Sequence, residues 1–192
     1  SALTYLAKAK QRSSSVGWWL NISSLFNETN KINVTDIVML ALEYIDDAQQ
    51  SVIYSQILLQ EMGATSNYLS GEGGAEELLE SAKDNRDNNY PAAALFEALE
   101  ALVKANLAIE TLGIEDEKIL LDKTDRANKS AASSISKSRS QGIEPILSVS
   151  YYEYAQSLAN KSEYDSALFY YKYSGMIAGA LSFTNVSADT SS

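Results

Sequence analysis

The residue types that most often carry enzyme chemistry are absent from this chain or poorly placed in it. The sequence has no cysteine and no histidine, which excludes thiolate nucleophiles, histidine triads, and zinc or haem sites built on these ligands. The segment Ser134–Lys137 matches the S-x-x-K pattern, in which a lysine amine activates a serine. Because the companion S-D-N and K-T-G elements are missing from a serine-rich chain, we interpret the match as accidental and predict no catalytic residue.

Two further patterns resemble ligand sites, but local structure explains them better. Asp46 and Asp47 are neighbours on a predicted helix, where successive side chains point about 100° apart, so they do not converge on a metal. The glycines of residues 71–74 precede a helix, as in a phosphate loop. No strand comes before them, however, and Glu76 and Glu77 occupy the first helical turn, where a phosphate would sit. We therefore predict no metal and no cofactor.

Composition narrows the class of protein and of partner. A chain of 192 residues, 45% apolar and 21% charged, is long enough to bury a core without metal or disulfide support. The 25 acidic and 15 basic residues give a net charge of -10, which repels nucleic acids and anionic lipid surfaces. We expect a protein or peptide partner and no nucleic acid.

Six segments fit the acceptor pattern for N-glycosylation, and they begin at Asn21, Asn27, Asn33, Asn128, Asn160 and Asn185. The 12 Asn and the 35 Ser or Thr residues of the chain would produce about two such segments by chance. A composition rich in Asn and Ser is the alternative explanation. The excess favours an extracytoplasmic location.

The two ends suggest that this chain was excised from a longer protein. It begins inside a predicted helix and stops in a polar tail, residues 182–192. No signal peptide opens the chain, and no apolar run approaches the roughly 18 residues of a membrane span. We therefore expect any membrane anchor of the parent protein to lie in segments outside this chain.

Apolar residues recur at helical spacing along most of the sequence and predict an all-α bundle of about seven helices, one domain over residues 1–192. A first helix is expected from Leu3 to Leu20, followed by an exposed loop over residues 21–34. The clearest stripe runs from Ile37 to Met62, with Thr35 or Asp36 as the N-cap. A Ser-rich helix is predicted over residues 115–139.

Two helical hairpins of one kind are predicted, at residues 75–112 and 144–181. Five landmarks recur 73 positions apart: Glu80, Ala82, Ala94, Leu95 and Phe96 correspond to Glu153, Ala155, Ala167, Leu168 and Phe169. The turn tyrosines, Tyr90 and Tyr164, miss this register by one. Alanines at the contacts would let the helices approach closely, as in tetratricopeptide-like hairpins. The usual repeat of about 34 residues is not met, so the kinship is loose.

Seven of the 12 tyrosines fall between Tyr151 and Tyr173, in the second hairpin. One interpretation is a core whose phenol oxygens reach the rim. The other is a tyrosine-lined docking groove for protein. The candidates for that groove are the tyrosines off the predicted inner stripe, Tyr152, Tyr170 and Tyr173. The inner stripe itself is predicted to hold Ile146, Leu147, Tyr151, Tyr154 and Leu158.

Three segments together resemble a known family. They are SSSVGWWL at Ser13–Leu20, Ser81–Ala82, and ALFEALEALVKANLAIE at Ala94–Glu110. They look like the helical region that follows the protease domain in archaeal Lon-like serine proteases, which lack a fused ATPase and tend to carry signal and membrane-anchor segments. The family's catalytic serine lies in a Gly-Pro-Ser-Ala-Gly-like motif, and no such motif occurs here.

The resemblance thus implies a noncatalytic accessory domain of an extracytoplasmic, membrane-anchored Lon-like protease. Its role would be substrate presentation or assembly, with its own protease domain as a partner. Alternatives that the residues leave open are a free-standing tetratricopeptide-like peptide-binding module and a surface structural protein. An enzyme in its own right would need Asp, Glu, Lys or Tyr side chains that converge in a deep pocket.

Overall fold

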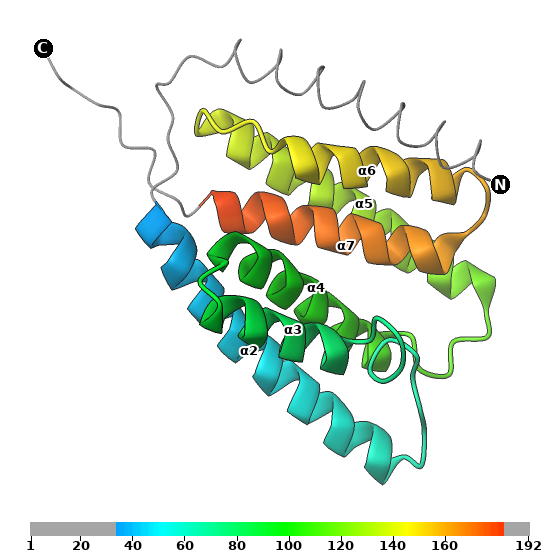
Figure 1. The fold of residues 1–192 in the computed structure, drawn as a ribbon. Helices are drawn as coiled ribbons and strands as arrows, with labels where there is room; N and C mark the ends of the chain where they lie inside the picture. The colour runs from blue at the N-terminus through cyan, green and yellow to red at the C-terminus, as the bar shows by residue number, and fades with distance from the viewer. Residues whose placement is uncertain (1–33, 183–192) are drawn as a thin grey trace, which may run out of the picture. The chain divides into compact units, whose positions relative to one another are not determined.

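Six α-helices make up the part of the chain that this computed structural model describes, residues 34–182 (Figure 1). In chain order they are α2 (Val34–Glu61), α3 (Ala75–Asp87), α4 (Pro91–Glu110), α5 (Glu117–Ser140), α6 (Ile146–Ala159) and α7 (Tyr164–Leu181). No strand occurs between residues 34 and 182, so the predicted all-α fold is confirmed. The predicted first helix lies outside the described residues, as do nearly all of the loop 21–34 and of the polar tail.

The six helices form two similar groups of three. In the first group α2 packs against α4 and α3, and α3 packs against α4. In the second group α5 packs in the same way against α7 and α6, and α6 against α7. A contact between α4 and α7 joins the two groups. The order of a long helix followed by a hairpin therefore occurs twice, and the described helices all fall within one unit, residues 34–185.

Both predicted hairpins are present, as α3 with α4 and as α6 with α7. Three of the residue pairs that recur 73 positions apart are no more than 2% exposed: Ala82 and Ala155, Ala94 and Ala167, Leu95 and Leu168. The turn repeats as well, because Asn89 and Ser162 both adopt the left-handed conformation, with φ of 63° and 62°. Tyr90 precedes α4, whereas Tyr164 is the first residue of α7, which explains why the tyrosines miss the register by one.

Small side chains line the contacts between helices and allow close packing. In the first group the alanines with no exposed surface are Ala48, Ala75, Ala82, Ala94, Ala98, Ala101 and Ala105. In the second hairpin two serines, Ser148 and Ser174, take this role. Each hydroxyl donates a hydrogen bond of 2.7 Å to the other residue's backbone carbonyl. Burying two hydroxyls in the α6–α7 contact therefore leaves neither of them unsatisfied.

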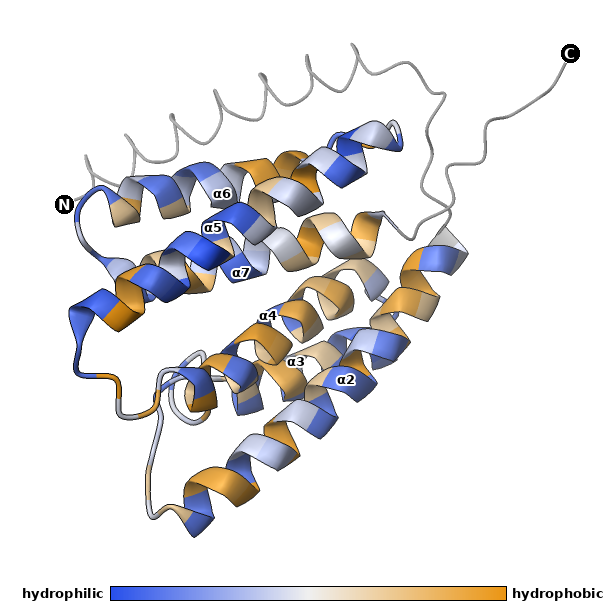
Figure 2. Ribbon diagram, turned by 180° about the vertical axis from the view of Figure 1, so that it is seen from behind, coloured by the Kyte–Doolittle hydropathy of each residue, from blue (hydrophilic) through white to orange (hydrophobic). Residues whose placement is uncertain are grey.

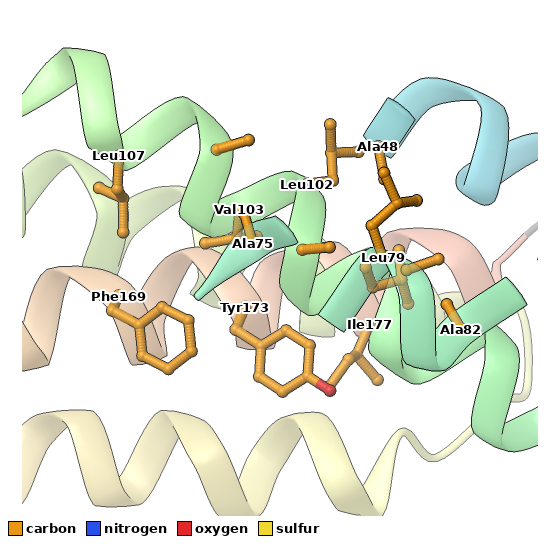
Figure 3. Packing of buried hydrophobic residues seen from close by; sticks show 14 of the residues in the cluster. Ala48, Ala75, Leu79, Ala82, Leu102, Val103, Leu107, Phe169, Tyr173 and Ile177 are labelled. Carbon is orange, nitrogen blue, oxygen red and sulfur yellow. The ribbon is translucent and has the colours of Figure 1, made fainter. Parts of the chain in front are cut away.

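Aromatic side chains of α7 fill the space next to α4. Phe169 and Tyr173 lie between the ribbons of α4 and α6 (Figure 3), and both are buried. The Tyr173 hydroxyl donates to the backbone carbonyl of Phe96 at 3.1 Å. The Lys104 ammonium lies 5.2 Å from the centre of the Phe169 ring, a distance suited to a cation–π contact. The two halves of the bundle are thus joined by ring packing together with polar contacts to α4.

Some local predictions were wrong. The helix α2 begins at Val34, so Thr35 and Asp36 lie in its first turn and neither is the N-cap. Ile146, Leu147 and Tyr154 are 37%, 40% and 49% exposed, although they were predicted on the inner face of their helix. Among the described helices, α6 packs mainly against α7 and less against α5, so its buried face is narrow and holds Ser148, Ala155 and Leu158. No helix within residues 34–182 has the length and apolar character needed to cross a membrane.

Candidate functional site

A groove of about 460 Å³ lies beside α7. We call it the α7 groove. One wall is α5 and the other is α4 with Tyr44 of α2, while α7 forms the floor. Figure 2 views the bundle from the side of α2 and α5 and shows that hydrophilic residues prevail along α5. The lining residues of α5 and α7 are Lys123, Arg126, Ala127, Ser130, Ala131, Ser134, Tyr171, Lys172, Gly175, Met176 and Gly179.

Small residues of α5 and α7 occupy the middle and the far end of the α7 groove. At Gly175 the two helices approach closely, since a Cβ placed there would lie 3.4 Å from the Cα of Ala131. One turn later, a Cβ placed at Gly179 would have no atom within 4 Å. Ala127, Ala131 and Ser134 continue this slim surface along α5. The helices α5 and α7 therefore touch at Gly175 and leave open space beside Gly179.

One end of the α7 groove carries a network of charges. Glu110 on α4 accepts from Lys172 on α7 at 2.6 Å and from Lys123 on α5 at 3.3 Å. Burial alone would raise the pKa of Glu110, but the hydrogen bonds and charges of the two lysines outweigh it and lower that pKa. Glu110 is therefore an ion at neutral pH, and it ties three helices together.

Arg126 adds a positive charge that this network does not neutralise. It is exposed on α5, and none of the ion pairs formed within residues 34–182 involves it. The lining of the α7 groove thus holds three basic side chains and one acidic one, on a chain whose net charge is -10. Basic groups gathered in a concave site of an acidic protein attract negatively charged partners.

The residues that line the opposite end of the α7 groove carry no charge. Met176 and Gly179 of α7 lie there with Ser134 of α5 and Tyr44 of α2. Burial, with the nearby charges of Glu43 and Asp47, raises the pKa of Tyr44 and keeps its phenol neutral. Ser134, the serine of the S-x-x-K match, lines the groove, whereas Lys137 does not.

The three tyrosines predicted to form a docking groove lie at two places in the second half of the bundle. Tyr173 is only 4% exposed and belongs to the core, which corrects its predicted place off the inner stripe. Tyr152 donates a 2.6 Å hydrogen bond to Asn128 of α5 and meets Tyr171 edge-on. Tyr170 lies between the rings of Tyr151 and Tyr154, with centroids 5.8 Å and 4.7 Å away. Tyr170 and Tyr173 are three residues apart on one face of α7, and both contact Tyr151 and Phe169, so Tyr152 is the one that lies apart from the other two.

Two sequons fall among the described residues, and they differ in accessibility. Asn128 lies within α5, where its side-chain oxygen accepts the hydrogen bond from Tyr152. Asn160 is exposed at the C-terminal end of α6, beside the turn at Ser162. The sequons at Asn21, Asn27, Asn33 and Asn185 lie outside the described part of the chain. Of the two that can be compared, only Asn160 offers a free amide in a turn.

The described residues contain no group of three or more His, Cys, Asp or Glu side chains arranged to hold a metal ion. Asp46 and Asp47 are both exposed on α2, as predicted for a solvated face. Gly74 precedes α3 as its N-cap residue, and Glu77 of the first turn accepts from the backbone of Gly73 at 2.7 Å. The loop of residues 71–74 thus turns toward a carboxylate of the protein itself.

Comparison of the chain with protein-family models, with curated proteins and with solved structures found no match.

Sequence reasoning did not find the α7 groove. Its basic residues lie 49 positions apart, from Lys123 to Lys172, and only the packing of α5 on α7 brings them together. One signal was present in the sequence. Lys123, Arg126, Ala127, Ser130, Ala131 and Ser134 follow helical spacing and place charged and small residues on one face of α5.

Proposed function

We propose that this chain is a noncatalytic protein-binding domain and that the α7 groove receives a segment of the partner protein. The observation that carries the proposal is the groove itself, which combines an open floor at Gly179 with basic side chains from two helices. Binding sites are typically concave and mostly apolar, with a few placed polar groups. The groove has this character, and its walls are rigid helices rather than loops.

Within this proposal, the chain serves as the accessory domain of an extracytoplasmic, membrane-anchored Lon-like serine protease. The resemblance of residues 13–20 and 94–110 to the helical region of such proteases supports this assignment. The six sequons support the location. The partner would be a substrate protein or the protease domain of the same protein, and the membrane anchor would lie in other segments.

The sequence that flanks this chain in its gene tests the assignment to a protease. A Gly-Pro-Ser-Ala-Gly-like serine motif in a protease domain upstream would agree with it. An open reading frame without such a domain would refute the protease assignment and leave a free-standing tetratricopeptide-like module. The two hairpins, which repeat in both sequence and turn conformation, favour that second candidate over a surface structural protein.

Glycan mapping tests the proposed location. In protein purified from its source, we expect a glycan at Asn160 and none at Asn128, because Asn128 is engaged by Tyr152 within a helix. Mass spectrometry of peptides would measure the occupancy of each site. An unmodified Asn160 would contradict the extracytoplasmic location, and a modified Asn128 would contradict the difference in accessibility.

Selection of binding peptides tests the proposed site. A random peptide library displayed on phage would be selected against the whole chain, and the selected peptides would then be measured against two variants. Gly179→Leu fills the open floor of the groove, whereas Ser133→Leu places the same side chain on an exposed face of α5 outside it. We expect Gly179→Leu to abolish binding and Ser133→Leu to preserve it. Peptides that bind Gly179→Leu normally, or a library that yields none, would overturn the proposal.

A further inference from the structure

The two ends of the α7 groove differ in chemistry, and the direction of the helices fixes where each end lies. The helices α5 and α7 run parallel, since Thr124 donates to the carbonyl of Tyr164 near their starts and Gly175 meets Ala131 further along. Lys123 and Lys172 are therefore at one end. Ser134 and Gly179 are at the other end.

The basic end of the α7 groove carries a net positive charge. Glu110 neutralises one of its two lysines in the network described above, while Arg126 keeps its full set of guanidinium donors toward solvent. Carboxylates are the natural partners of such a group, because the planar guanidinium fits them with two parallel hydrogen bonds. This end therefore selects a negatively charged group.

The other end has apolar surface and room. Met176 and Tyr44 line it, and the missing side chain at Gly179 leaves the space of a bulky residue. Methionine adapts its shape to different apolar groups and contacts aromatic rings favourably. This end therefore selects an apolar or aromatic side chain.

We infer that the α7 groove binds an extended peptide segment with acidic residues at one end and a bulky apolar residue at the other. The inference rests on the proposed protein-binding function and adds the chemistry of the bound segment. Arg126 and Ser134 are eight residues apart on α5, which corresponds to about 12 Å along the helix axis. An extended chain covers this distance in about four residues. The acidic and apolar groups of the ligand are therefore spaced about four residues apart.

Three synthetic peptides labelled with fluorescein test the inference by anisotropy with the whole chain. The first is Glu-Glu-Ala-Gln-Ala-Phe-Leu. The second replaces both Glu residues by Lys, and the third replaces Phe-Leu by Ser-Ser. We expect the first peptide to bind at least about tenfold more tightly than either of the others, with an affinity that falls as salt is added.

Charge variants of α5 locate the contact. Arg126→Glu should weaken binding of the first peptide about tenfold, and Arg126→Lys should weaken it less, because lysine keeps the charge but loses the two parallel hydrogen bonds. Lys129→Glu makes the same change in net charge on an exposed face of α5 outside the groove, and we expect no effect. Equal losses in Arg126→Glu and Lys129→Glu, or tighter binding of the lysine peptide, would overturn the inference.

Failure of the inference can be told apart from failure of the proposed function. If peptides selected from the random library bind through Gly179 but lack acidic residues, the groove is a binding site and only the inferred chemistry is wrong. If no peptide, selected or designed, is sensitive to Gly179→Leu, both are wrong.

Discussion

The two sides of α7 show how side-chain size decides where this bundle is solid and where it is hollow. On the side that faces α4 and α6, Phe169 and Tyr173 fill the space between the helices (Figure 3). On the side that faces α5, the residues include Gly175 and Gly179, and a groove of about 460 Å³ opens there. The same helix thus supplies part of the core and the floor of a surface site, and the difference lies in its side chains.

The largest expected effect is on the solid side. Tyr173→Ala should lower the free energy of unfolding by about 3–5 kcal/mol, because it removes a buried ring and leaves a cavity between α4 and α6. Tyr173→Phe keeps the ring and removes only the hydrogen bond to Phe96, so about 1 kcal/mol is expected. Urea denaturation measures both. Similar losses in the two variants would show that the ring does not fill this space.

The two glycines sharpen the comparison on the hollow side. Gly175→Leu should destabilise the protein by about 1–3 kcal/mol, since the added side chain would meet Ala131 where α5 and α7 touch. Gly179→Leu should instead stabilise it by about 0.5–1 kcal/mol, because the site is open and glycine is a poor helix former. Thermal and urea unfolding of the pair would decide. Equal destabilisation by both would contradict the open floor.

A smaller effect is expected from the charges at the basic end. The lysines lower the pKa of Glu110 in the folded state below its usual value near 4.5, so the network stabilises the protein above that pH. This stabilisation is lost as the pH falls through the lowered pKa, because Glu110 is then protonated in both states. Glu110→Gln should therefore cost about 1 kcal/mol or less at pH 7, and the cost should shrink as the pH falls below about 4.5. A cost that does not change with pH would contradict the network.

A matched pair on the surface provides the control. Glu80 and Lys83 form an ion pair at 2.9 Å on α3, but the Glu80 side chain is 71% exposed. Glu80→Gln should change the free energy of unfolding little at any pH, since exposed pairs are screened by solvent. The contrast with Glu110→Gln isolates the contribution of the groove.

The sequence predicts the helices and hairpins of this fold well because both depend on local patterns. Apolar residues at helical spacing located α2 and α5 to within a few residues, and the 73-residue register of Ala82 with Ala155 located both hairpins. These signals are repeated many times along each helix. A single exception, such as the exposed Tyr154, does not hide them.

The α7 groove could not be predicted from helical spacing, because it depends on a missing side chain at Gly179. Gly175 and Gly179 read as weak points of a helix, and nothing local shows that one meets Ala131 while the other meets open space. Tyr173 was predicted off the inner face of its hairpin, but it is buried. Spacing within its own hairpin placed it off the inner face, but α4 of the other hairpin covers it. Faces that become buried through contacts between distant segments are invisible to periodicity.

The most direct test of the account uses the methyl groups of methionine. The chain has three methionines, of which Met176 lines the α7 groove while Met39 and Met62 are exposed on α2 or just beyond its end. With these methyl groups labelled with carbon-13, NMR spectra would be recorded during titration with a peptide selected from the random library. Binding in the α7 groove should produce a saturable shift of the Met176 signal and no change for Met62. A shift of Met62 or Met39 with Met176 unchanged would place binding elsewhere and contradict the account.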